Sequence, residues 1–314
     1  MAGKETMVES GLRATRRRRW KWRREYWGYV CVIPAIAWIV GVMLVPLIDV
    51  LLISLQNAAP SGSSYAGLAH YQQILTGNFG QTLFWPSTWR TVWFTVGSVV
   101  SHLVVGLGLA LLVNNVRWRA LFRGIVLIPW VMPGIVVAFI WLWMYQDQYG
   151  MINGALSHLG LAQWRQAWLG QAGTALPAVL VANVWRHSVF DTIMFLAGLQ
   201  GIPRDYYEAA SMDGAGAWQS FRHVTIPALR SITLTVTLLD FIWSFGAFDL
   251  IWLMTGGGPM DTTHVLGTLV YRTAFRYIDV PEGAAVATVM FVFIAVAAVG
   301  YVWLSRRLAP EDLQ

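Results

Sequence analysis

Six long apolar runs, separated by polar connections, dominate the pattern of hydrophobic and polar positions along this chain. They cover roughly Tyr29–Leu55, Trp93–Val113, Ile125–Tyr145, Leu176–Leu199, Leu229–Met254 and Ala284–Leu304. A helix needs about 20 apolar residues to cross the hydrocarbon core of a bilayer. The pattern therefore predicts an all-α polytopic membrane protein with six transmembrane helices. Pro129 and Pro133 are expected to kink the third helix.

The polar connection between the fourth and fifth runs, residues 202–227, predicts a helix–turn–helix. Asp205 and Glu208 have the spacing of a capping box, and Gly214 suits the left-handed turn that ends a helix. A second short helix is expected from about Trp218 to Val224, ending before Pro227. A capped helix between two membrane spans indicates a docking element, whereas the alternative is an ordinary loop.

Composition supports the membrane prediction, because 56% of residues are hydrophobic, only 12% are charged and the mean hydropathy is +0.52. Soluble domains have about a quarter charged residues. One cysteine, Cys31, excludes an intrachain disulfide and a multi-cysteine metal site. No metal site is predicted.

The placement of Lys and Arg predicts the orientation of the chain. Nine of the 22 fall in Lys4–Arg24, and with both termini in the cytoplasm 17 lie inside and four outside. This asymmetry is typical of membrane proteins. The prediction has three parts: a basic, Arg- and Trp-rich cytoplasmic segment at 1–28, a six-span domain at 29–307 and a cytoplasmic tail at 308–314. The basic segment is expected to face anionic lipid rather than nucleic acid.

The outer connections contain no recognisable catalytic motif. A short helix is expected near Leu161–Trp168, and the glycine run at Thr255–Pro259 is expected to end the fifth span. The chain has no GxxxxGK[ST], HExxH or GxSxG sequence. We therefore expect no catalytic residue and no cofactor bound by this chain. An intramembrane enzyme is the disfavoured alternative.

Polar side chains inside the fourth and fifth spans are the candidates for a substrate path, since intramembrane polar groups usually face a cavity or the bundle interior. In each span the polar residues share one helical face with aromatic or small residues, at the spacing i, i+3, i+4 and i+7. The two sets are Asn183, Arg186, His187 and Phe190, and Asp240, Trp243, Ser244 and Ala247. Hydrogen-bonding groups beside aromatic faces suit a sugar. Structural pairing, or contact with a partner subunit, stays open as the alternative. His102 is interpreted as a packing feature.

The stretch Glu208-Ala209-Ala210, then Gly214, then Val224-x-Ile226-Pro227 resembles the EAA loop of permease subunits in bacterial ABC importers. Val224 and Ile226 stand where the family usually has Ile and Leu. Leu107–Asn114, Ile128–Trp130, Leu196–Gln200 and Thr255–Pro259 look like the carbohydrate branch, of maltose or glycerol-phosphate type. The similarity covers about residues 27–307.

The resemblance implies a type I ABC importer permease in the bacterial plasma membrane, which pairs with a second permease to pass a sugar delivered by an extracytoplasmic solute-binding protein. A dimeric ATPase would bind ATP and Mg and receive the coupling loop. The residues implied in that contact are Arg204, Asp205, Tyr207, Glu208, Ala209, Ala210, Asp213 and Gly214.

The resemblance also places the family's sugar-contacting positions on the two sets of residues in spans four and five. Arg186, His187 and Asp240 depart from the small, apolar or hydroxyl residues of the maltose type, which puts maltose in doubt. Import of glycerol 3-phosphate or a glycerophosphodiester is the alternative substrate. A self-sufficient secondary transporter is less favoured, since those folds usually contain internal repeats.

Overall fold

The computed structural model describes residues 29–57, 64–76, 83–116 and 119–308, and these fold almost entirely into helices. The predicted basic segment 1–28 and nearly all of the tail at 308–314 lie outside the described residues. The chain divides into two units at Ile53. The first unit contains one helical stretch, Tyr29–Ile53, which includes a π-helical turn η1 (Val40–Leu44) and α2 (Val45–Ile53). This stretch confirms the first predicted span.

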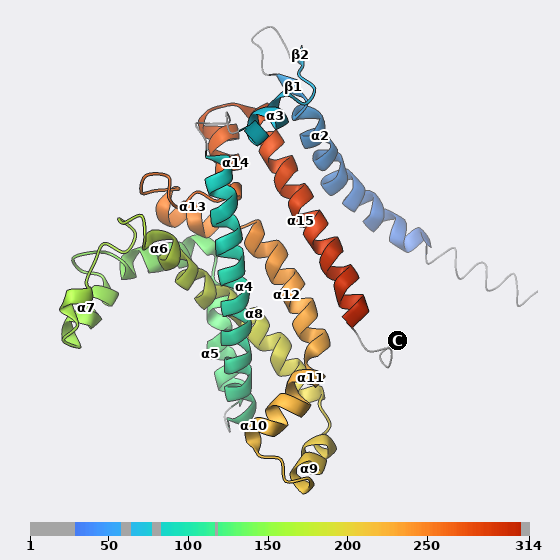
Figure 1. Ribbon diagram of the computed structural model, residues 1–314, viewed down its shortest axis with the longest axis vertical. Helices are drawn as coiled ribbons and strands as arrows, with labels where there is room; N and C mark the ends of the chain where they lie inside the picture. Colours follow the sequence, from blue (N-terminus) through green and yellow to red (C-terminus); the bar gives the residue numbers. More distant parts are fainter. Residues whose placement is uncertain (1–28, 58–63, 77–82, 117–118, 309–314) are drawn as a thin grey trace, which may run out of the picture. The chain divides into compact units, whose positions relative to one another are not determined.

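The second unit is built around two long helices, α4 (Phe84–Asn115) and α8 (Ala175–Gly201). They approach closely at Gly106, where an added Cβ would lie 2.4 Å from the Cβ of Asp191. A third helix, α12 (Arg230–Phe245), packs against both, and α15 (Val280–Leu308) packs against α12. Figure 1 shows the polar connection at one end of α4 and α8, with α14 at the other end of α4.

The shorter elements of this unit connect the long helices. They are β1 (Gln56–Asn57), β2 (Ser64–Tyr65), α3 (Ala69–Thr76), α5 (Arg119–Val131), α6 (Gly134–Met144), α7 (Met151–His158), η3 (Ala162–Trp164), α9 (Arg204–Met212), α10 (Ala217–Ser220), η4 (Phe221–Thr225), α11 (Ile226–Ala228), α13 (Asp249–Thr255), α14 (Leu266–Tyr271) and η5 (Arg272–Arg276). The two strands form one antiparallel pair.

The third predicted span is bent much more than a proline kink requires. Helices α5 and α6 meet at 94°. Pro129 lies inside α5, and Pro133 is the N-cap of α6 with extended backbone at ψ 139°. The residue before a proline avoids helical backbone, so the helix ends ahead of Pro133. The predicted kink is confirmed, and its size redirects the chain.

The fifth predicted span, Leu229–Met254, is wrong as a single helix. Helix α12 ends at Phe245, and α13 begins only at Asp249, after Phe248 adopts φ −138° and ψ −58°. The apolar residues of α13 pack on α6, where Leu250 and Ile251 join the buried cluster of Val137 and Ala138. This tertiary contact redirects an apolar run that would otherwise continue along α12.

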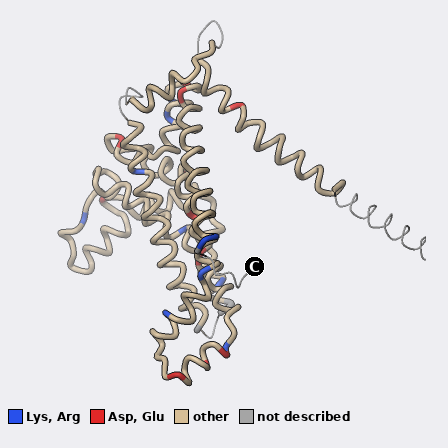
Figure 2. The backbone as a smooth tube through the Cα atoms, turned by 45° about the vertical axis from the view of Figure 1, so that its right-hand side comes forward, with Lys and Arg blue, Asp and Glu red and all other residues tan. Residues whose placement is uncertain are grey.

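Three helices of the described residues are long and apolar enough to cross a membrane, and five spans result if each bent pair counts as one. The predicted fourth span is a continuous helix of 27 residues, α8, but it is not among them. Its polar residues Asn183, Arg186, His187 and Asp191 lower its hydropathy. Figure 2 shows how sparsely charged residues occur along the tube.

The connection at residues 146–174 contains α7 in place of the helix predicted near Leu161–Trp168, where only the short turn η3 forms. The buried amide of Asn153 holds this connection together. Its Nδ2 donates to the carbonyl oxygens of Asp147 (3.1 Å) and Gln166 (3.0 Å). Its Oδ1 accepts from Trp168 Nε1 at 2.9 Å. The segment near Leu161–Trp168 is therefore held by side-chain hydrogen bonds and does not form the predicted helix.

Candidate functional site

The polar connection forms a hairpin of two helical arms, defined here as residues 203–228. The first arm, α9, ends in a left-handed glycine, Gly214, with φ +80°. Gly214 N–H donates to Ser211 O at 3.1 Å, and Ala215 N–H donates to Ala210 O at 2.9 Å. This pair of bonds satisfies two of the helix's last carbonyl groups. The predicted role of Gly214 in ending the helix is confirmed.

The predicted capping box at the start of this arm is wrong. Pro203 occupies the N-cap position and no side chain caps the helix, so Asp205 and Glu208 both lie within α9. Asp205 lies in the first turn, where a carboxylate interacts favourably with the helix dipole. The Glu208 side chain is exposed, which leaves it available for contacts outside the chain.

The second arm is helical from Ala217 to Ala228 and continues through Pro227, where the sequence predicted an end. A π-helical turn, η4, precedes α11, and Pro227 lies in the first turn of α11. The helix breaks instead at Leu229, with a bend of 65° into α12.

The two arms of the hairpin are joined by a hydrogen bond between Tyr207 Oη and Thr225 Oγ1 at 2.9 Å. The hairpin also carries large apolar side chains in contact with solvent. Tyr206, Met212 and Trp218 are 60%, 87% and 70% exposed. These exposed apolar side chains are available for contacts outside the chain. The structure thus brings the predicted docking residues onto one protruding element.

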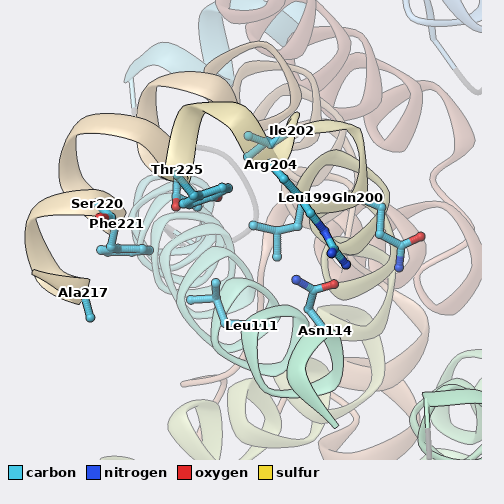
Figure 3. Close-up of a pocket in the computed structure, with 11 residues that line it drawn as sticks. Leu111, Asn114, Leu199, Gln200, Ile202, Arg204, Ala217, Ser220, Phe221 and Thr225 are labelled. Carbon is cyan, nitrogen blue, oxygen red and sulfur yellow. The ribbon is translucent and has the colours of Figure 1, made fainter. Parts of the chain in front are cut away.

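A cavity of 630 Å³ lies between the hairpin and the adjoining ends of α4 and α8 (Figure 3). Arg204 and Tyr207 line it, together with residues that sequence reasoning did not select. Those are Leu111, Asn114, Leu199, Gln200, Ile202, Ala217, Ser220, Phe221 and Thr225.

The polar faces of the fourth and fifth predicted spans meet through His102, which sequence reasoning treated as packing. Asn183 Nδ2 donates to Ser98 Oγ at 3.1 Å and lies 3.3 Å from His102 Nε2. His102 Nδ1 lies 3.3 Å from Asp240 Oδ2. His102, Asn183 and Asp240 are all buried. An ionisable residue within a membrane span is the sequence signal that could have identified His102 as a functional candidate.

Arg186 pairs with Asp249 and not with Asp240. Its NH1 donates to Asp249 Oδ2 at 3.0 Å, at the start of α13. Gly134 leaves room for this pair, since a Cβ there would lie 2.6 Å from Asp249 Oδ2 and 2.9 Å from Arg186 NH1. The Asp249 side chain is 55% exposed. The pair therefore joins α8 to α13 at the edge of the bundle rather than deep inside it.

An aromatic cluster adjoins these polar groups. The rings of Phe190 and Trp243 are 5.0 Å apart edge to face, and Trp130 stacks on Phe190 at 5.5 Å. Trp243 remains 44% exposed. Trp130, which sequence reasoning missed, comes from α5 just before the bend. Its position between Pro129 and Pro133 was the local signal that the chain turns there.

A small cavity of 50 Å³ connects the two predicted polar faces. It is lined by His102, Asn183, His187, Asp240, Trp243, Ser244, Ala247 and Asp249. His187 Nδ1 donates to the backbone oxygen of Asn183 in its own helix, at 3.2 Å. Six of the eight predicted path residues thus surround one space, with Arg186 and Phe190 beside it. One or two water molecules occupy about this volume in liquid water, so a sugar does not fit in this conformation.

The arrangement of helices is that of ABC importer permeases. The crystal structure of a bacterial ABC transporter involved in the import of the acidic polysaccharide alginate matches with a TM-score of 0.79 and 22% identity, covering 93% of this chain and all of that one. The trehalose/maltose transport system permease protein MalF of Thermococcus litoralis is 34% identical over 91% of this chain and 96% of its own length. The sulfoquinovosyl glycerol transport system permease protein SmoG of Agrobacterium fabrum is 35% identical over 76% of this chain and 75% of its own length.

Residues 102–310 match the family of binding-protein-dependent transport system inner membrane components, and the chain belongs to this family. It is therefore a multi-pass membrane permease subunit with the type I fold that the sequence predicted. It is not an enzyme, because ATP hydrolysis in these transporters belongs to a separate subunit.

Proposed function

We propose that this chain and a second, different permease together form the path for a sugar that an extracytoplasmic solute-binding protein delivers. The observation that carries the proposal is the meeting of a hydrogen-bonding cluster with an aromatic cluster around one space. Asn183, His102 and Asp240 supply polar contacts, and Trp243 supplies a partly exposed ring face. Sugars need both, since their hydroxyl groups bind polar atoms and their ring faces stack on aromatic side chains. Relatives named for trehalose/maltose and sulfoquinovosyl glycerol support this class of substrate.

The charges of the site favour a neutral sugar over a glycerol phosphate. Among the described residues, Asp240 and Asp249 line the small cavity and no Lys or Arg does. The neighbouring Arg186 is already paired with Asp249. An anionic phosphate entering here would meet carboxylates, which repel it. Because the space is too small for a sugar, the complete site requires movement of these helices and the second permease.

The hairpin is proposed to dock on a dimeric ATPase, which binds ATP and Mg. Its contact residues would be Arg204, Asp205, Tyr207, Glu208, Ala209, Ala210, Asp213 and Gly214. The hairpin connects α8 directly to α12, and these helices carry the two polar faces. Movement of the hairpin would therefore be transmitted to the sugar site through rigid elements, which is the physical requirement for coupling.

This function is tested by reconstituting the chain with its second permease, ATPase and binding protein in lipid vesicles. Trp243→Ala removes a stacking surface and is expected to lower sugar affinity about tenfold, with reduced sugar-stimulated ATP hydrolysis. Trp143→Ala is the matched control, since Trp143 is 62% exposed and does not line the cavity. Equal uptake by Trp243→Ala and the parent at limiting sugar would exclude this site. The purified chain alone is expected to hydrolyse no ATP.

A further inference from the structure

The 630 Å³ cavity beneath the hairpin is separate from the sugar site, and none of its lining residues belongs to the polar or aromatic clusters described above. Two groups of elements form its walls. Helices α4 and α8 supply Leu111, Asn114, Leu199 and Gln200, and the hairpin supplies most of the rest. The volume lies within the range of about 300–1,000 Å³ that is typical of small-molecule sites. The cavity therefore spans the joint between the hairpin and the membrane helices.

The polar lining of this cavity is suited to a hydroxylated anion. Asn114 and Gln200 offer amide groups, and the hairpin adds the hydroxyl groups of Tyr207, Ser220 and Thr225. Among the described residues that line the cavity, Arg204 is the only charged side chain and none is a carboxylate.

Arg204 is also available for a ligand. The ion pairs found among the described residues do not include it. Figure 3 shows the Arg204 and Asn114 side chains pointing toward one another across the cavity. A guanidinium group presents several donors in a planar fork that matches the oxygens of a phosphate. The amide and hydroxyl groups around it match hydroxyl groups on the remainder of such a ligand.

We propose that this cavity binds a small organic phosphate that bears hydroxyl groups, such as a sugar phosphate, and that its binding restrains transport. A ligand here touches α4 and α8 on one side and the hairpin on the other. It stabilises whichever arrangement of the joint closes around it, because a ligand shifts an equilibrium by its differential affinity for the two states. The restraint on transport, and access from the cytoplasm, rest on the proposed function. Binding of the phosphate to the cavity does not depend on that function.

The binding test uses the purified chain in lipid nanodiscs, without ATPase or sugar. Isothermal titration calorimetry compares glucose 6-phosphate, inorganic phosphate and glucose. Glucose 6-phosphate is expected to bind at least tenfold more tightly than either of the others, because only it has both the charge and the hydroxyl groups. Failure of glucose 6-phosphate to bind, or equal binding of all three probes, overturns the proposal.

Variants locate the site. Arg204→Gln and Asn114→Leu are each expected to weaken glucose 6-phosphate binding about tenfold or more. Arg222→Gln is the matched control, because Arg222 is exposed on the same hairpin and does not line the cavity. Thermal unfolding verifies that each variant folds. If Arg204→Gln does not fold, Asn114→Leu, which keeps the hairpin sequence intact, provides the test of the binding site. Binding equal to that of the parent in Asn114→Leu overturns the proposal.

A second arm tests the consequence in the assembled transporter. Glucose 6-phosphate on the ATPase side is expected to lower sugar-stimulated ATP hydrolysis in the parent but not in Asn114→Leu. Unchanged hydrolysis in the parent at a saturating probe concentration overturns the restraint on transport. If Arg204→Gln binds the probe normally but no longer retains the ATPase during purification, the cavity receives an ATPase side chain and the proposal is wrong. Failure of sugar transport itself, with normal probe binding, contradicts only the proposed function.

Discussion

A single residue, His102, connects the three helices α4, α8 and α12. Its ring lies on α4, with Asn183 of α8 at 3.3 Å on one side and Asp240 of α12 at 3.3 Å on the other. All three side chains are buried, so water does not replace the contacts between them. Removing one member leaves the others unpaired, which costs about 1–3 kcal/mol. The three residues therefore act as one unit.

We predict that His102→Ala and Asp240→Asn each weaken sugar affinity about tenfold to hundredfold while the protein still inserts. Because the residues act as one unit, the double variant should be much less impaired than the sum of the two effects. Sugar-dependent ATP hydrolysis by the assembled transporter measures this double-mutant cycle. Thr235→Ala, an exposed position on α12, is the control. Additive effects would mean that His102 only fills space.

His264 is a second buried histidine, in the connection between α13 and α14, and its surroundings keep it neutral. Its side chain is 2% exposed, and it lies over Gly257, where a Cβ would come within 2.1 Å of the ring. Burial, together with the positive charge of the nearby Arg272, lowers the pKa of His264 to about 4. Asp261, 3.4 Å from Nε2, acts in the opposite direction, but its carboxylate also binds Arg272 at 2.6 Å.

This lowered pKa predicts a loss of stability in mild acid. Between pH 6.5 and about 4 the unfolded chain binds a proton that the folded chain does not, so the free energy of unfolding falls as pH falls. From pH 7 to pH 5 the loss is on the order of 2 kcal/mol. Thermal unfolding in detergent should show a larger decrease for the parent than for His264→Gln. Equal decreases would show that His264 does not contribute.

Among the secondary-structure elements, the apolar runs predicted where most helices lie in the sequence. They did not predict where the chain bends between them. Pro129 and Pro133 marked the bend between α5 and α6, because proline acts through local backbone geometry. No proline marks the break after Phe245, where α13 packs on α6 in a contact between segments distant in sequence. Trp130 escaped notice for the same reason. Its place beside Phe190 follows only once the 94° bend is known.

The hairpin permits a test in which only backbone conformation changes. Gly214 has φ +80° and an added Cβ would meet nothing within 4 Å, so a substitution there strains the turn without a clash. We predict that Gly214→Val costs roughly 1–2 kcal/mol locally and uncouples sugar uptake from ATP hydrolysis. Both rates are measured in reconstituted vesicles. Gly216→Ala is the control, because Gly216 has φ −74°, which alanine adopts readily. Normal coupling in Gly214→Val would show that the turn is not needed for docking.

At the scale of the whole molecule, sequence alone established the class of fold, because hydrophobic runs and the placement of Lys and Arg are properties of the entire chain. The polar faces were predicted in part, since helical spacing places Asn183 and His187 on one face wherever the helix lies. Their partners were not predictable in this way. Whether Arg186 pairs with Asp240 or Asp249 depends on the break between α12 and α13, which places Asp249 on a separate helix.

The orientation of the chain gives the last prediction, because docking on a cytoplasmic ATPase requires the hairpin to lie inside. Met212 on the hairpin and Tyr149 in the connection before α7 are 87% and 79% exposed, so a cysteine at either position is open to reagents. Cys31, which is also exposed, is first replaced in Cys31→Ser.

In right-side-out vesicles a membrane-impermeant thiol reagent should label Tyr149→Cys and not Met212→Cys, and inside-out vesicles should reverse the result. The Cys31→Ser parent is the control for background labelling. Adding the ATPase to inside-out vesicles should then protect Met212→Cys, because the docked surface is covered. Labelling of both positions from the same side would contradict the predicted topology. Labelling of Met212→Cys that the ATPase does not slow would place the docking surface elsewhere on the hairpin.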